Sequence, residues 1–126
     1  AEKVALVDAL SACGFRRVEA ASFVSPKWVP QMADGAEVMA RIARPPGVAF
    51  MALAPNLRGY RAARAAEADW VCVFAAATEG FSRANLNAPV DESLDRLAEV
   101  AEEAAKDGVP VRGYVSVVTD CPYEGE

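Results

Sequence analysis

The residues best suited to chemistry lie at or near the ends of predicted strands. Glu19 is close to the end of the segment FRRVEA, where a carboxylate is costly unless it meets a cation, a metal-bound water or several donors. Arg112, Tyr114 and Ser116 occupy every second position of VRGYVS, so their side chains share one side of that strand. This pattern indicates a polar barrel interior or a functional site, although an interface could also satisfy the three groups. A salt bridge between Glu19 and an arginine such as Arg112 is the plain structural alternative.

Further candidates follow the second and third predicted strands. Asn56, in the segment APN, either caps the next helix or contacts a ligand, and capping is the more common role. Asn85 and Asn87 lie near Phe81 in AATEGFSRANLN, which we expect to form a long loop. From these residues alone, the sequence predicts a polar cluster at the strand ends and leaves the function open.

Helices and strands alternate along the chain to position these residues. Strands are predicted at 15–20, 48–54, 70–77 and 109–118, and helices at 2–14, 30–43, 57–66 and 91–108, the last capped by Asp91. This order predicts right-handed crossovers and a parallel sheet, either an open doubly wound sheet or part of a (β/α)8 barrel. In both architectures functional groups collect at the C-terminal ends of the strands. No Gly-rich phosphate fingerprint follows any strand, which weakens the dinucleotide-binding version of the open sheet.

The composition restricts the possible partners and cofactors. Hydrophobic residues make up 53% of the sequence, charged residues make up 25%, and the net charge is −5. We therefore expect no nucleic-acid partner, and no apolar run reaches the roughly 20 residues of a membrane span. The absence of His excludes a His-based nucleophile and a His metal site. Three separate cysteines and lone carboxylates do not form a metal site either, and the odd cysteine count predicts a reduced, intracellular protein.

The connection after the first strand, SFVSPKWVPQM, is unusually apolar for a loop. We expect a rigid lid segment in which Pro26 and Pro30 limit backbone freedom. Its large apolar side chains, Trp28 among them, would pack on the next helix or contact a partner, and Ser22 is the better functional candidate, with Lys27 either functional or a surface charge.

Consecutive segments of the chain resemble the 3-hydroxy-3-methylglutaryl-CoA lyase family. They are ALVDALSACGFRRVEAASFVSPKWVPQMAD, APNLRGYRAA, VFAAATEGFSRANLN, ESLDRLAEVAEEAAKDGVPVRGYVS and CPYEGE. The resemblance implies a TIM barrel in which residues 1–126 form part of one catalytic domain, roughly strands 2 to 5. It also implies metal-dependent cleavage of 3-hydroxy-3-methylglutaryl-CoA to acetyl-CoA and acetoacetate, a reaction of leucine degradation and ketone-body formation. The one visible departure is Asp120, where the family more often has Gly.

The resemblance also implies roles for individual residues. Glu19 matches a catalytic glutamate that organises the metal-bound water and a catalytic arginine. Ser22 and Asn85 match substrate-binding residues. Three further residues match site-supporting positions, and we expect the last of them to pack rather than react: Arg112, Tyr114 and Cys121.

The family's metal ligands and its catalytic arginine lack counterparts in this sequence. They include an HxH pair, and this chain has no His. The resemblance therefore implies that Mg²⁺ or Mn²⁺ is held by residues outside the chain and that the chain alone is inactive. It further implies an acyl-CoA substrate, a homodimer or higher oligomer, and a bacterial cytoplasmic or eukaryotic mitochondrial location.

Two other interpretations remain open at this point. The chain could be a non-catalytic α/β module that self-associates through the edges of its sheet. It could also belong to a barrel lyase of the same family that acts on a related acyl-CoA.

Overall fold

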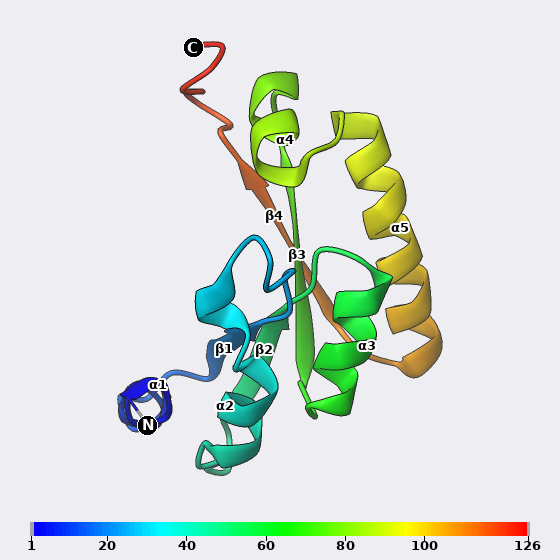
Figure 1. Cartoon of the computed structure of the whole chain (residues 1–126). Coiled ribbons are helices and arrows are strands. Elements are labelled where there is room, and N and C mark those ends of the chain that lie inside the picture. Colours follow the sequence, from blue (N-terminus) through cyan, green and yellow to red (C-terminus); the bar gives the residue numbers. More distant parts are fainter. Residues whose placement is uncertain (1, 126) are drawn as a thin grey trace.

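The computed structural model describes residues 2–125 and forms one parallel sheet with helices packed along one side (Figure 1). The strands are β1 (Arg17–Ser22), β2 (Ala49–Leu53), β3 (Trp70–Ala76) and β4 (Val111–Ser116). The helices are α1 (Glu2–Ser11), the 3₁₀ helix η1 (Pro30–Met32), α2 (Gly35–Arg41), α3 (Leu57–Ala65), α4 (Glu79–Leu86) and α5 (Val90–Asp107). The strand order β1-β2-β3-β4 follows the chain, as in successive units of a (β/α)8 barrel.

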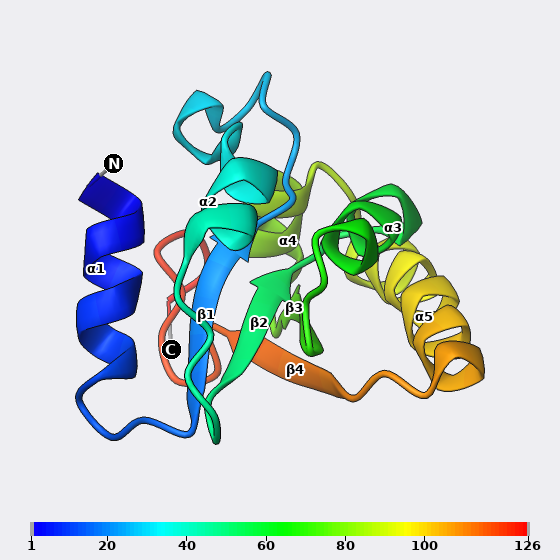
Figure 2. The same cartoon turned by 90° about the horizontal axis from the view of Figure 1, so that it is seen from below.

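Each crossover helix packs on the strand that precedes it in the chain. Helix α2 packs on β1, α3 on β2 and α5 on β3, whereas α1 contacts both β1 and α2 (Figure 2). We call this side of the sheet the helix-covered face and the opposite side the concave face. Within residues 2–125, no helix is long and apolar enough to cross a bilayer.

The hydrophobic core lies between the helix-covered face and the helices. Alternate residues of β1, β2 and β3 point into it, which is the period of two expected of strands. Core residues from the strands are Val18, Phe50, Ala52, Val71 and Val73. The intervening Met51 and Cys72 are also buried, so β2 and β3 are covered on both faces and read as nearly continuous apolar runs.

A β-bulge interrupts β1 before its C-terminal end. Glu19 pairs with Met51, and Ser22 pairs with Leu53. Two residues lie between Glu19 and Ser22 on β1, but only one lies between Met51 and Leu53 on β2. The extra residue at Ala20 therefore restores Ser22 to the same face as Glu19. In an unbroken strand these two side chains would lie on opposite faces.

Several predicted boundaries are wrong near the ends of elements. The first strand was predicted at 15–20 but runs from Arg17 to Ser22. The predicted helix 30–43 is divided into η1 and α2, and its second part begins at Gly35, which lies against the backbone oxygen of Ser22. A Cβ atom at Gly35 would lie 3.4 Å from that oxygen, which is an ordinary van der Waals contact.

The segment predicted as a long loop after β3 contains helix α4 instead. The Thr78 hydroxyl caps it by accepting from the Phe81 N–H, and Asn87 ends it in the left-handed conformation. The predicted cap of the longest helix is also wrong, because α5 starts at Val90 after Pro89. Asp91 lies in the first turn, where its charge favours the positive end of the helix dipole.

Helix α3 is tied to both of its neighbours. Asn56 caps it by accepting from the Gly59 N–H at 2.9 Å, in agreement with the capping role expected of this residue. The buried Tyr60 hydroxyl donates to Asp107 on α5 at 2.6 Å. Burial, followed by this carboxylate, raises the pKa of Tyr60 to about 12.

Candidate functional site

The concave face gathers polar side chains from β1, β3 and β4. The Tyr114 hydroxyl donates to Glu19 Oε2 at 2.9 Å, joining the two outer strands of the sheet. In a flat sheet these strands would lie three spacings apart, about 14 Å, with side chains standing away from the sheet plane. The hydrogen bond therefore requires the sheet to curl. We call Glu19, Cys72, Arg112 and Tyr114 the concave-face cluster.

Arg112 and Cys72 complete the concave-face cluster on adjacent strands, where the two residues are register partners. The Cys72 sulfur lies 3.8 Å from the Tyr114 hydroxyl. Burial raises the pKa of the Cys72 thiol to about 12, and the neighbouring Glu19 carboxylate adds to the rise. The thiol therefore stays protonated at neutral pH.

The charges of the cluster also act on Tyr114 and Arg112. Burial raises the pKa of Tyr114, and the Glu19 carboxylate reinforces this effect while the Arg112 guanidinium opposes it. The adjacent Tyr114 hydroxyl raises the pKa of Arg112, so the guanidinium remains a permanent positive charge. The cluster thus combines a fixed cation, a neutral phenol and a carboxylate on one surface.

The predicted alternative of a salt bridge between Glu19 and Arg112 is wrong for the described part of the chain. The ion pairs among residues 2–125 do not join these two side chains. Glu19 instead accepts from Tyr114 and remains exposed on the concave face. Its second oxygen is therefore accessible to a group that approaches this face.

A cation–π contact lies below the cluster, near the N-terminal ends of the strands. The Arg17 guanidinium is 4.2 Å from the centre of the Trp70 ring. Arg17 shares the strand face of Glu19 and comes from the same strand. Because the N-terminal face of a barrel usually serves stability, we assign this contact to packing rather than chemistry.

Ser22 lies at the mouth of the sheet, above Glu19. The bulge gives both side chains the same strand face, and Ser22 also lines a cleft of about 350 Å³. The cleft lies between the loop after β1 and the start of α3, and Pro26, Asn56 and Arg58 contribute to its lining. The structure therefore places Ser22 near Glu19 along the strand and on the wall of a separate cleft.

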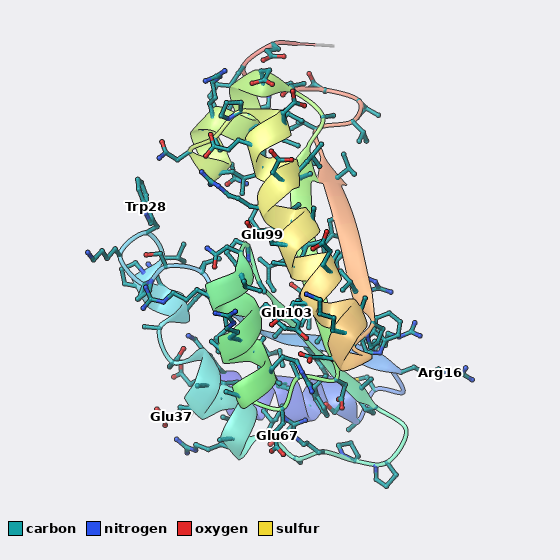
Figure 3. All side chains as sticks on the ribbon, turned by 90° about the vertical axis from the view of Figure 1, so that its right-hand side faces the viewer. Arg16, Trp28, Glu37, Glu67, Glu99 and Glu103 are labelled. Carbon is teal, nitrogen blue, oxygen red and sulfur yellow. The ribbon has the colours of Figure 1, made fainter. Side chains whose placement is uncertain are left out.

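The loop after β1 is compact, but its tryptophan does not pack on the next helix. The N–H groups of Trp28 and Val29 donate to the Ser25 carbonyl, and Pro30 opens the 3₁₀ turn η1. Trp28 is 79% exposed and points away from the molecule (Figure 3). The predicted packing of Trp28 on the next helix is therefore wrong, because this turn directs the indole outward, and the alternative contact with a partner stays a prediction. Lys27 is exposed beside it.

Asn85 is not gathered with the concave-face cluster. It lies in the last turn of α4 and is exposed to solvent. Helix α4 packs on β3 and α5, so Asn85 belongs to the outer layer near the C-terminal end of β3.

Cys121 is buried in a tight turn at the N-terminus of α4. The turn is closed by reciprocal backbone hydrogen bonds between Cys121 and Gly125, and the thiol lies 3.0 Å from the Thr78 hydroxyl. Glu124 accepts from the Gly80 N–H, which fixes the turn to α4. Burial pushes the pKa of Cys121 up, but hydrogen bonds from Thr78 and from the turn backbone outweigh it and lower the pKa.

The described residues do not by themselves fit a divalent-metal site. Mg²⁺ and Mn²⁺ prefer several oxygen ligands, and the concave-face cluster offers one carboxylate beside a fixed positive charge. Residues 2–125 contain no group of three His, Cys, Asp or Glu side chains able to hold a metal ion.

The sequence pattern did not identify Cys72 or the bulge. In the sequence Cys72 lies within the apolar run WVCVFAAA, yet it faces the same side as Arg112 because the two are register partners. The polar residues at alternate positions of β4, Arg112 and Tyr114, indicate this face in the sequence. Aligning β3 with β4 in the observed register would have placed Cys72 on the same face. The bulge left no comparable signal, because Ala20 and Ala21 read as ordinary strand residues.

Comparison with protein families and curated sequences gives a consistent set of relatives. The HMGL-like family model matches residues 1–124. The mitochondrial hydroxymethylglutaryl-CoA lyase of Gallus gallus is 54% identical over 98% of this chain and 41% of the relative. The 3-hydroxy-3-isohexenylglutaryl-CoA/hydroxy-methylglutaryl-CoA lyase of Pseudomonas aeruginosa is 53% identical over 100% of this chain and 42% of the relative.

Solved structures show the same similarity in three dimensions. The HMG-CoA lyase of Brucella melitensis has a TM-score of 0.95 and 56% identity, covering 97% of this chain and 43% of that chain. An HMG-CoA lyase from Acinetobacter baumannii, solved with coenzyme A and 3-methylmalate, has a TM-score of 0.93 and 34% identity over 98% and 40% of the two chains. The chain thus spans about two fifths of the length of its relatives. The predicted family resemblance and the predicted partial (β/α)8 barrel are confirmed.

Proposed function

Because the chain belongs to the HMGL-like family, we propose that residues 1–126 form part of the catalytic domain of a hydroxymethylglutaryl-CoA lyase. The observation that carries this proposal is the hydrogen bond from Tyr114 to Glu19 across the concave face. It presents an oriented, solvent-accessible carboxylate on the inner surface of the partial barrel. A permanent cation, Arg112, lies in the same cluster.

The proposed reaction is a retro-Claisen cleavage of 3-hydroxy-3-methylglutaryl-CoA. A base removes the proton of the tertiary hydroxyl, and that oxygen becomes the ketone oxygen of acetoacetate as the adjacent C–C bond breaks. The electron pair of the broken bond passes to the acetyl thioester as an enolate, which takes up a proton to give acetyl-CoA. The enolate oxygen therefore needs electrostatic stabilisation as it develops charge.

Within this scheme the cluster orients the groups at the reacting centre. Glu19 is the proposed catalytic carboxylate, and Tyr114 fixes one of its oxygens so that the other faces the substrate. Arg112 supplies a positive charge that balances the negative charge of the substrate. Support for these roles comes from their common strand face and from the 2.9 Å contact.

Three further residues have proposed roles outside the concave-face cluster. Ser22 is a substrate-binding residue in this scheme, because the bulge places it on the strand face of Glu19. Asn85, exposed on α4, would reach the substrate only from the rim. Cys121 supports the site by packing, since it is buried against Thr78.

Lyases of this family are metal-dependent in general, and the metal supplies Lewis-acid activation of the substrate oxygens when it is bound. We propose Mg²⁺ or Mn²⁺, held by residues outside these 126. The substrate is an acyl-CoA, in line with the coenzyme A complex of the Acinetobacter relative. We further propose a homodimer or higher oligomer, located in the cytoplasm of a bacterium or the mitochondrial matrix of a eukaryote, with a part in leucine degradation and ketone-body formation.

A second candidate substrate is a longer 3-hydroxyglutaryl-CoA ester. The Pseudomonas aeruginosa relative is named for both 3-hydroxy-3-isohexenylglutaryl-CoA and hydroxymethylglutaryl-CoA, and it matches the whole chain at 53% identity. A comparison of kcat/KM for the two esters decides between them.

The test uses a full-length lyase carrying this chain. This protein is either the product of the complete reading frame that contains residues 1–126 or a chimera. In the chimera, residues 1–126 replace the matching segment of the Pseudomonas aeruginosa relative. We expect metal-dependent release of acetoacetate by this protein and none by residues 1–126 alone. Turnover by the short chain alone would contradict the placement of the metal ligands. Inactivity of the folded full-length protein on both esters would contradict the lyase proposal and favour a non-catalytic module, whose self-association a solution mass would measure.

A further inference from the structure

The fully buried thiol of Cys72 is the member of the concave-face cluster for which the proposed reaction has no role. It lies on β3, in register with Leu53 of β2 and Arg112 of β4. Its sulfur is 3.8 Å from the Tyr114 hydroxyl, within the range of a hydrogen bond to sulfur. A purely apolar side chain would fill the same space, because a buried Cys packs as a small hydrophobic residue.

The direction of the hydrogen bonds assigns a donor role to this thiol. A phenol has a single hydroxyl hydrogen, and Tyr114 gives it to Glu19. The contact with sulfur therefore has the S–H of Cys72 as donor and the Tyr114 oxygen as acceptor. The three groups form a chain in which the thiol donates to the phenol and the phenol donates to the carboxylate.

Such a chain acts cooperatively. A hydroxyl that accepts one hydrogen bond becomes a better donor in the next, so the S–H contact strengthens the bond from Tyr114 to Glu19. The thiol also restricts rotation of the Tyr114 hydroxyl, because a lone pair of the Tyr114 oxygen must face β3 while the hydroxyl hydrogen faces β1. Because Cys72 is fully buried, its S–H group cannot donate to water instead.

We propose that Cys72 is a positioning residue, whose S–H group directs the Tyr114 hydroxyl toward Glu19. The consequence for turnover rests on the proposed lyase function, whereas the hydrogen-bond chain itself does not. Cys72 touches no reacting atom in this scheme and acts only through Tyr114.

Two substitutions separate the donor role from packing. In the full-length lyase carrying this chain, Cys72→Val keeps an apolar side chain but removes the donor, and Cys72→Ser keeps a donor but is smaller and more polar. We expect Cys72→Val to lower kcat about 3- to 10-fold with little change in KM, and Cys72→Ser to retain more of kcat. Stability should follow the opposite order, with Cys72→Val unfolding at the higher denaturant concentration. Cys13→Ser, at an exposed cysteine, is the matched control and should leave both quantities unchanged.

A readout independent of turnover follows the phenol directly. In protein with ¹³C-labelled tyrosine, the Tyr114 ring carbon signal, identified by its loss in Tyr114→Phe, should shift in Cys72→Val and return toward the original position in Cys72→Ser. If kcat and the ring signal instead follow stability, with Cys72→Val equal to or better than Cys72→Ser, the thiol only packs and the proposal is wrong. If the ring signal responds as expected but the folded protein has no lyase activity, the hydrogen-bond chain stands and the proposed function fails.

Discussion

The substitution Tyr114→Phe tests the contact that joins β4 to β1. It removes the hydroxyl that donates to Glu19 at 2.9 Å and leaves the aromatic ring in place. A hydrogen bond to a charged group contributes roughly 1.5–3 kcal/mol, and the exposure of both side chains places this one near the lower limit, about 1.5 kcal/mol. If the contact is made fully in the transition state, kcat/KM falls about 10-fold.

The assay is acetoacetate release by the full-length lyase carrying this chain, at saturating metal and at several substrate concentrations. Tyr123→Phe is the matched control, because Tyr123 is exposed and lies in the turn against α4 rather than on the concave face. We expect the control to retain full activity. An unchanged kcat/KM in Tyr114→Phe, with the fold intact, would refute the argument that this hydroxyl orients Glu19 for chemistry.

Two further predictions concern the packing around α3. Tyr60→Phe removes the hydrogen bond to Asp107 and should lower the free energy of unfolding by about 1–2 kcal/mol in urea denaturation. Folding raises the pKa of Tyr60 from 10.0 to about 12, so the folded state holds the phenol proton more tightly than the unfolded state. The contribution of this proton to the free energy of unfolding is complete below pH 10 and is lost as the pH rises toward 12. This loss should be absent in Tyr60→Phe. Gly59→Ala would place a Cβ atom 2.8 Å from the Phe23 carbonyl oxygen, so we expect destabilisation of about 1–3 kcal/mol, and an unchanged melting temperature would contradict that close approach.

The strands at the centre of the sheet could be predicted closely because their sequence carries one dominant signal. VAFMALA and WVCVFAAA are apolar on both faces, and the structure buries β2 and β3 on both sides. Helix α5 was equally clear, with apolar residues at helical spacing and Gly108 at its end. The alternation of four helices and strands fits both a barrel and an open sheet, and the family resemblance indicates the barrel.

The errors occurred where tertiary contacts override local pattern. The short, mostly polar sequence of helix α4 predicts a loop, whereas the start of the helix depends on the Thr78 cap and on Glu124 from the distant C-terminal turn. The bulge at Ala20 depends on pairing with β2, which the sequence of β1 does not encode visibly. The outward orientation of Trp28 results from the backbone turn at Ser25 rather than from its apolar character.

The site could be predicted in part. The alternation of Arg112 and Tyr114 correctly indicated a polar strand face, and their proximity to Glu19 is a consequence of sheet curl that spacing alone does not give. The expected partner of Glu19 was an arginine, but the structure provides a phenol, because Tyr114 is the side chain that reaches across the concave face. Cys72 was missed since a cysteine between valines reads as core.

The most direct test of the central claim is Glu19→Gln in the full-length lyase carrying this chain. Gln keeps the shape of the side chain and can still accept from Tyr114, but it removes the carboxylate charge. If Glu19 is the catalytic carboxylate of the concave face, kcat for 3-hydroxy-3-methylglutaryl-CoA cleavage should fall about 100-fold or more, with the melting temperature nearly unchanged. A folded Glu19→Gln enzyme that keeps its kcat would contradict the claim that this face performs the chemistry.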